Sequence, residues 1–150
     1  EESDIRIRRT VLIGLFSFWE LSLKDLCEYY KINVTKAKKN KKENKSTRES
    51  NLSENDYLNA IFRDNRPEII GLISSQIKEL RNYMTHGSAG EGRQEIIDTL
   101  MAARPDFGIS KVCGGYSINS YDGLDEMLKT ITDGLTDAET TAKTLKTQIN

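Results

Sequence analysis

The chain of 150 residues carries 22 lysine and arginine residues against 23 aspartate and glutamate residues, which gives a formal net charge of −1. This length suits one domain over residues 1–150, with a hydrophobic core of its own. The near balance of charge argues neither for nor against a nucleic-acid partner, so the distribution of the charges must decide.

Cysteine usage and hydropathy exclude several other classes of protein. Two cysteines, Cys27 and Cys113, are too few for a disulfide framework, and the chain has no C-x-x-C pair of the kind that binds zinc. We therefore expect neither a metal nor a cofactor. The longest apolar run, residues 11–19, is too short to cross a bilayer, and no signal peptide is visible. We expect a reduced, cytoplasmic protein without a membrane partner, processed or trimmed at its start because it begins Glu-Glu-Ser.

Residues 5–32 are expected to form one long helix, because apolar residues recur there at spacings of three, four and seven. The middle of this helix is apolar on most sides, which predicts a place at the centre of a bundle, or in an interface as well as a core. Glu20 lies at the edge of the apolar surface, where an unpaired buried carboxylate would cost roughly several kcal/mol. Glu20 therefore either faces solvent or holds an arginine of a functional site.

A basic segment follows the first helix. Residues 34–50 lack apolar periodicity and contain seven lysine or arginine residues against two glutamates. This composition is typical of a solvated, flexible loop, which we take to cover residues 34–52. The same positive charge would attract RNA phosphates through salt-sensitive, non-specific contacts. The two interpretations are compatible.

Two helices are expected after the basic segment. The first covers residues 56–65, and Ser53 with an aspartate three residues later would cap it. The second has Pro67 in its first turn, where proline is favoured. It ends at Gly87, because glycine readily takes the left-handed conformation that terminates a helix.

The last third of the chain changes its periodicity. A helix around residues 96–101 is expected to end before Pro105. Two short β-compatible runs flank Gly114-Gly115 and suit a small hairpin. Apolar residues three or four apart over residues 124–149 indicate a long amphipathic helix. The expected fold class is therefore all-α, a helical bundle of four to five helices with a short β-hairpin before the last helix.

The stretch RNYMTHG, residues 81–87, closes the most regular helix and holds the only histidine of the chain. Five helical residues turn through about 500°, so Arg81 and His86 would lie ~140° apart, whereas Asn82 would share the face of His86. Two interpretations are open. His86 is a polar residue favoured by the dipole at a helix C-terminus, or the arginine and the histidine together cleave a phosphodiester bond.

The same stretch resembles the signature of HEPN domains, helical nucleotide-binding domains that include many ribonucleases. That signature is an arginine, usually followed by a polar residue, with a histidine four to six positions on; Arg81, Asn82 and His86 match its R-x-x-x-x-H form. The first helix, with FSFWELSLKDL, resembles the aromatic-Trp-Glu opening of the RiboL-PSP-HEPN branch, and Glu20 matches an acidic residue that lies near the motif there. The hairpin and the long last helix also fit.

The resemblance implies a metal-independent RNA endonuclease. Arg81 would bind the phosphate, His86 would transfer protons, and Glu20 would orient one of the two. Three further residues are expected to contact or support the substrate: Asn82, Thr85 and Ser88. The basic segment is not part of the shared pattern, so no role is carried over to it.

The resemblance also implies partners. A single histidine cannot easily serve as acid and base on opposite sides of one phosphorus atom, so we expect a homodimer through the first helix and the motif helix. HEPN ribonucleases commonly dimerise with their motifs in a shared groove. The expected role is that of a toxin or effector in a toxin–antitoxin or anti-phage defence system, with a cognate antitoxin or a larger defence assembly as partner. The alternatives are a non-catalytic RNA- or nucleotide-binding and dimerisation module and a plain structural bundle.

Overall fold

The computed structural model describes residues 2–36, 52–87 and 92–149. Its α-helices are α1 (Glu2–Tyr29), α2 (Glu54–Phe62), α3 (Glu68–Gly71), α4 (Lys78–His86), α5 (Arg93–Ala103) and α6 (Tyr121–Ile149). A π-helical segment, η1 (Leu72–Ile77), joins α3 to α4 without a break, and a 3-10 turn, η2 (Pro105–Phe107), follows α5. Strands β1 (Ile109–Val112) and β2 (Gly115–Ile118) pair antiparallel. The predicted helical bundle with a hairpin before its last helix is confirmed.

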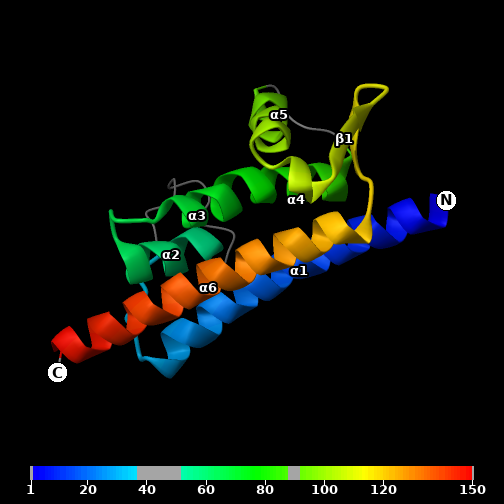
Figure 1. The fold of residues 1–150 in the computed structure, drawn as a ribbon. Helices are drawn as coiled ribbons and strands as arrows, with labels where there is room; N and C mark the ends of the chain where they lie inside the picture. The colour runs from blue at the N-terminus through cyan, green and yellow to red at the C-terminus, as the bar shows by residue number, and fades with distance from the viewer. Residues whose placement is uncertain (1, 37–51, 88–91, 150) are drawn as a thin grey trace, which may run out of the picture.

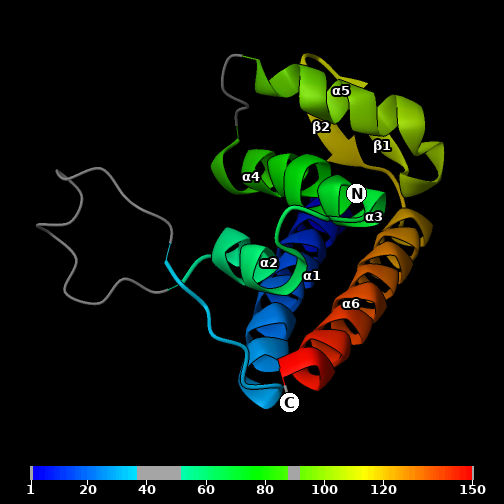
Figure 2. The same cartoon turned by 90° about the vertical axis from the view of Figure 1, so that its left-hand side faces the viewer.

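The two longest helices, α1 and α6, lie side by side along the molecule (Figure 1). The continuous helix α3–η1–α4 and the short α2 pack onto this pair, and α5 with the hairpin forms a further layer over α4 (Figure 2). One hydrophobic cluster draws on all these layers. None of the described helices is long and apolar enough to span a bilayer.

The first helix buries the stripe that its periodicity predicts. Leu12, Phe16, Trp19 and Leu23 are fully buried, at spacings of three or four residues. The helix ends at Tyr29, three residues earlier than predicted, because Lys31 takes a left-handed conformation with φ 53°. The continuing apolar pattern had suggested a longer helix, since apolar residues after the turn also pack on the core.

The predicted cap of α2 is confirmed. Ser53 accepts a hydrogen bond from the backbone N–H of Asp56, and the Asp56 carboxylate accepts one from the backbone N–H of Ser53. These reciprocal bonds satisfy two of the backbone donors that a helix start leaves free. The cap starts α2 at Glu54, two residues earlier than predicted, and this position matters for the candidate site below.

The hairpin turn lies one residue earlier than the predicted Gly114-Gly115. Its two central residues are Cys113 and Gly114, with φ of 52° and 79°, and a two-residue hairpin loop of this kind needs positive φ at both. Gly115 belongs to β2 and is needed for a different reason. A Cβ atom there would lie 2.6 Å from Oη of Tyr83 in α4, and that oxygen accepts a hydrogen bond from the backbone N–H of Tyr116. The hairpin is thereby fixed to the motif helix.

A glycine also sets the distance between α6 and its neighbours. A Cβ atom on Gly134 would lie 2.5 Å from Cδ1 of Ile73 and 3.2 Å from Cζ3 of Trp19. Both of those side chains are fully buried. The absence of a side chain at Gly134 therefore lets α6 approach η1 and α1 closely.

We expect Gly134→Ala to lower the free energy of unfolding by about 1–3 kcal/mol, because its methyl group would overlap two buried side chains. Gly71→Ala is the matched control, since its backbone is helical and its Cβ would meet nothing within 4 Å. That change should raise the free energy of unfolding by up to about 1 kcal/mol. Urea denaturation measures both, and a Gly134→Ala protein as stable as the parent would contradict the close approach of α6.

Candidate functional site

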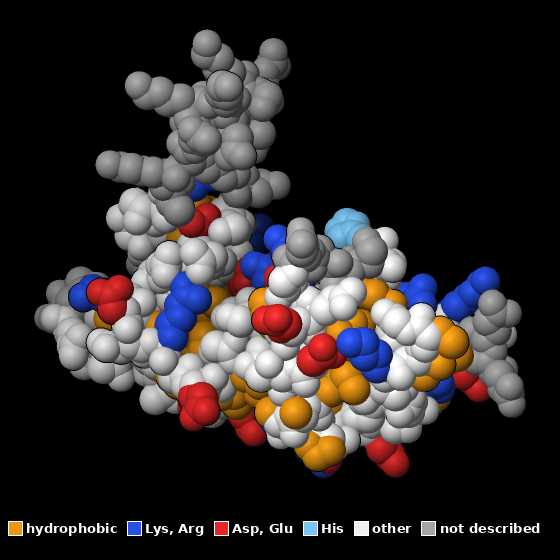
Figure 3. All heavy atoms as spheres, turned by 90° about the horizontal axis from the view of Figure 1, so that it is seen from above, with side chains coloured by type: hydrophobic (Ala, Val, Ile, Leu, Met, Phe, Trp, Pro, Cys, Tyr) orange, Lys and Arg blue, Asp and Glu red, His pale blue; other side chains and the backbone are white. Residues whose placement is uncertain are grey.

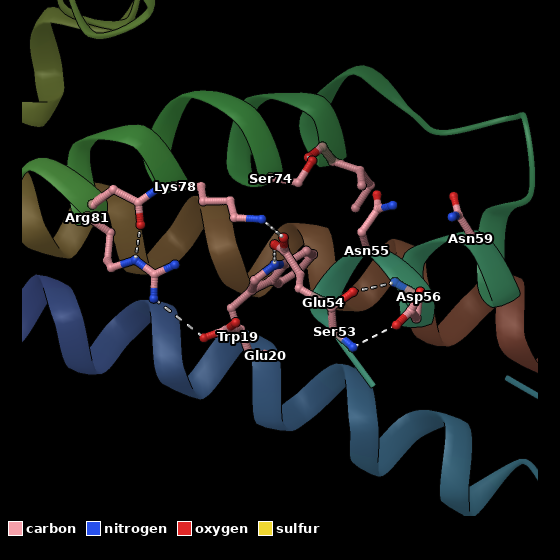
Figure 4. A network of polar contacts seen from close by, with 12 residues as sticks. Trp19, Glu20, Ser53, Glu54, Asn55, Asp56, Asn59, Ser74, Lys78 and Arg81 are labelled. Atoms are coloured by element: carbon pink, nitrogen blue, oxygen red, sulfur yellow. Dashed lines mark hydrogen bonds and ion pairs between the residues drawn. The ribbon is translucent and has the colours of Figure 1, made fainter. Parts of the chain in front are cut away.

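Arg81 is held in one orientation by groups from α1 and α4 (Figure 4). Its Nη1 lies 3.7 Å from Oε1 of Glu20, and its Nε donates a hydrogen bond of 3.0 Å to Oδ1 of Asn82. The guanidinium carbon lies 4.5 Å from the centroid of the Phe16 ring. Because 20% of the Arg81 side chain stays exposed, this oriented cation can still be reached by a ligand.

Glu20 satisfies both interpretations of its position in the sequence. Its side chain is 39% exposed, and it also lies beside Arg81. An ion pair this open to solvent and this long adds little to stability, about 0–1 kcal/mol. Its effect is to direct the guanidinium, which makes Glu20 a positioning residue for Arg81.

His86 lies in the exposed last turn of α4. Gly87 ends the helix as predicted, with φ 76° and a backbone N–H bonded to the carbonyl of Tyr83. The histidine, pale blue in Figure 3, stands at the surface. Within the described residues it makes no hydrogen bond or ion pair. The structure thus brings Glu20 and Arg81 together and leaves the imidazole of His86 open to solvent.

The predicted supporting residues are used inside the protein to different extents. The amide oxygen of Asn82 is bound to Arg81. The hydroxyl of Thr85 donates a hydrogen bond of 2.9 Å to the backbone carbonyl of Arg81, so it braces the last turn of the helix. Ser88 lies outside the described residues. Asn82 therefore supports the arginine, while Thr85 supports the backbone that carries it.

A buried polar cluster that the sequence did not reveal lies next to Arg81 (Figure 4). Oε2 of Glu54 accepts a hydrogen bond of 2.6 Å from the indole N–H of Trp19, and Oε1 of Glu54 lies 3.2 Å from Nζ of Lys78. Only 2% of the Glu54 side chain is exposed. Burial raises the pKa of Glu54, while the charge of Lys78 and the Trp19 hydrogen bond act in the opposite direction.

This cluster connects to the arginine site through neighbours in the chain. Trp19 precedes Glu20 on α1, and Lys78 lies three residues before Arg81 on α4. The only sequence signal for the cluster is that a buried tryptophan usually finds an acceptor for its N–H. By sequence alone, Glu54 is an ordinary acidic residue near the start of a helix, where the helix dipole favours a negative charge.

An open groove of about 490 Å³ adjoins the site. It lies between α1, the start of α2, and α4, and its lining includes Glu20, Lys24, Glu54 and Lys78. The two carboxylates balance the two lysines, and Lys78 is already paired with Glu54. Lys24 is therefore the lysine of the groove that can meet a phosphate-bearing ligand which also reaches Arg81. A hollow of about 510 Å³ at the other end of α1 is lined by aromatic, acidic and aliphatic side chains of α1 and α6 and by no lysine or arginine, so it suits such a ligand less well.

Most of the basic segment lies outside the described residues. Val34 and Leu52, at the two ends of the predicted loop, pack against the core. The predicted flexible loop covers residues 34–52, of which residues 37–51 lie outside the described residues. Over the described ranges, no three histidine, cysteine, aspartate or glutamate side chains gather as a metal site requires.

Comparison of the chain with protein-family models, with curated proteins and with solved structures gave no match.

We expect Glu54→Gln to change how stability depends on pH. Since folding raises the pKa of Glu54, the folded state binds more protons than the unfolded state between the two pKa values, and stability falls as pH rises through that window. Glutamine keeps an oxygen for the Trp19 N–H and removes this titration. The stability of the variant relative to the parent, from urea denaturation, should therefore increase as the pH rises above about 4, the ordinary range of a glutamate pKa.

Glu139→Gln is the control, because it replaces a half-exposed carboxylate on the surface of α6. Its difference from the parent should change much less over the same pH range. The account of Glu54 is wrong if the two variants behave alike.

Proposed function

We propose that this protein is a metal-independent RNA endonuclease of the HEPN type, with Arg81 and His86 in its active site. The observation that carries the proposal is the fixed but accessible guanidinium of Arg81, which Glu20 and Asn82 hold beside a helix end with an exposed histidine. This arrangement agrees with the roles that the R-x-x-x-x-H resemblance implies for Arg81 and Glu20.

The chemistry needs three contributions. The 2′-hydroxyl must lose its proton as it attacks the phosphorus atom, the phosphate must be stabilised as it gains negative charge, and the leaving 5′-oxygen must gain a proton. Arg81 can donate two hydrogen bonds to the phosphate oxygens. His86 can remove or supply a proton, because imidazole titrates near neutral pH. The products would be a 2′,3′-cyclic phosphate and a 5′-hydroxyl.

RNA binding would extend from the arginine into the adjoining groove. Lys24 lines that groove and would pair with a phosphate flanking the one that is cleaved. Contacts of this kind are independent of base sequence and weaken as salt increases. One histidine per chain supports a homodimer, through α1 and α4, as the active form.

In the cell, we propose a cytoplasmic role as the toxin or effector of a toxin–antitoxin or anti-phage defence system, restrained by a cognate antitoxin or a larger assembly. The alternative is a non-catalytic HEPN-type module that binds RNA or nucleotides and dimerises. One observation favours this alternative: His86 is exposed and makes no hydrogen bond or ion pair within the described residues, so nothing in a single chain orients it for proton transfer.

Incubation of the purified protein with end-labelled RNA in EDTA tests the proposal. We expect cleavage to continue in EDTA and to leave 2′,3′-cyclic phosphate ends. His86→Ala should lower the rate by about 100-fold or more, because it removes the proton-transfer group. Arg81→Ala should have an effect of similar size, through lost stabilisation of the charged phosphate.

Arg66→Ala is the control for a lost arginine, because Arg66 bonds to exposed asparagines of α2 away from the motif and should not affect cleavage. If cleavage survives in His86→Ala, the motif is not the active site. If no protein in the set cleaves RNA but the parent binds it, the non-catalytic module is the better account.

A further inference from the structure

The side chain of Tyr83 in α4 is held from outside its own helix. Its hydroxyl oxygen accepts a hydrogen bond of 3.1 Å from the backbone N–H of Tyr116 in β2. The two tyrosine rings meet edge to face, with centroids 5.2 Å apart and planes at 88°. Such ring pairs contribute about 0.5–1.5 kcal/mol beyond the area that they bury. Tyr83 is therefore fixed to the hairpin by one polar and one aromatic contact.

The hairpin residue that holds Tyr83 is in turn bonded to α5, which lies over α4 together with the hairpin (Figure 2). The hydroxyl of Tyr116 donates a hydrogen bond of 2.7 Å to Oδ1 of Asp98, and Nζ of Lys111 lies 3.4 Å from Oδ2 of the same carboxylate. The bond to Tyr116 lowers the pKa of Asp98, while burial and the bond to Asp98 raise the pKa of Tyr116 to about 12. Both groups therefore keep their protonation states, and their bond, over the neutral range of pH.

Tyr83 also occupies a decisive place in the helix end that carries His86. Its backbone carbonyl accepts the hydrogen bond of 2.7 Å from the N–H of Gly87, which closes the helix directly after His86. Its side chain lies three positions before His86, so the two are ~60° apart around the helix and share a face. Helical side chains lean back over the residues three and four positions earlier. We therefore expect the imidazole of His86 to lean toward Tyr83 and Asn82.

These two neighbours of His86 are both fixed, one from each side of α4. Asn82 is bonded to Nε of Arg81, and Tyr83 is bonded to the hairpin. Over the part of the chain that the structure describes, no other side chain bonds to His86. We propose that Tyr83 is a positioning residue for His86, and that the hairpin and α5 act on catalysis through it. Its part in catalysis rests on the proposed ribonuclease activity, whereas the placement of His86 can be measured without that activity.

The last turn of α4 has other anchors that keep it folded. Met84 is only 5% exposed and packs in the core, and Gly87 ends the helix in a left-handed conformation. Loss of the Tyr83 hydroxyl would therefore leave the turn in place and free the side chains on its outer face. The expected defect is a lower kcat with little change in KM, because Arg81 binds the phosphate and His86 acts in the transition state.

Proton NMR of His86 tests the positioning in the absence of RNA. Tyr83→Phe keeps the ring and removes the acceptor for the Tyr116 N–H, and we expect the imidazole signals to move toward those of the chain in denaturing urea. Gly115→Ala should have the same effect without altering Tyr83, because its Cβ would lie 2.6 Å from the Tyr83 hydroxyl oxygen. Tyr29→Phe is the control, since that side chain is 76% exposed, and it should leave the signals in place.

Retained dispersion of the methyl signals shows that each variant is folded. Imidazole signals that are the same in the parent, in Tyr83→Phe and in Gly115→Ala would overturn the proposal.

Cleavage of RNA gives the second readout. We expect Tyr83→Phe to lower kcat by about 10-fold and to change KM by less than about twofold, because a small misplacement of a catalytic group is costly. In a His86→Ala background the same change should have no further effect, since Tyr83 acts through His86. An equal loss with and without His86 would show a merely structural role and overturn the proposal. If the parent cleaves no RNA, the proposed function fails and the NMR comparison still decides whether Tyr83 positions His86.

Discussion

The hydrogen bond from the Trp19 indole to the Glu54 carboxylate is the contact on which the geometry of the candidate site depends. Trp19 is fully buried, and its ring lies where Gly134 allows α6 to approach. Its N–H reaches the first turn of α2, and the same carboxylate binds Lys78 of α4. One polar cluster thus joins three helices, and a buried donor or acceptor left without its partner would cost about 1–3 kcal/mol. Because the loss of these partners is unfavourable, the cluster keeps α1 and α4 in the register that sets Glu20 beside Arg81.

Much of this architecture could be predicted from local patterns. The apolar stripe of α1, the cap formed by Ser53 and Asp56, and the glycine that ends α4 each follow from rules that act over a few residues. The hairpin turn falls on Cys113-Gly114 and not on Gly114-Gly115, which local rules favour, because Gly115 is needed where β2 meets Tyr83. Rules that act over a few residues cannot predict a turn position that depends on a residue distant in the sequence.

The candidate site, too, could be predicted from the sequence only in part. The position of Glu20 at the edge of an apolar stripe, together with the resemblance, left open whether it faces solvent or orients Arg81 or His86, and the structure places it beside Arg81. The part played by Glu54 could not be foreseen, because it depends on the packing of three helices around one tryptophan. The π-helical segment before Lys78 was also missed, since its apolar spacing is that of an ordinary helix. Such segments are frequent near functional sites.

The first helix has a buried apolar face and also exposes large apolar side chains. The buried face builds the core and presents Glu20 to the arginine, and the exposed side chains include Phe18 and Leu21. The composition of the helix, apolar on most sides, predicts a place at the centre of a bundle, or in an interface as well as a core. The homodimer that we propose would supply the second histidine that the proposed chemistry calls for.

We propose that the phosphodiester of RNA binds between Arg81 and His86. The chain has one histidine, so its imidazole proton signals can be assigned without ambiguity in a proton NMR spectrum. Titration with an RNA oligonucleotide whose 2′-hydroxyls are methylated, and which therefore cannot be cleaved, tests the claim most directly. The account predicts that the His86 signals shift with saturation in the parent and much less in Arg81→Ala. Signals that stay in place while the RNA is bound would contradict it.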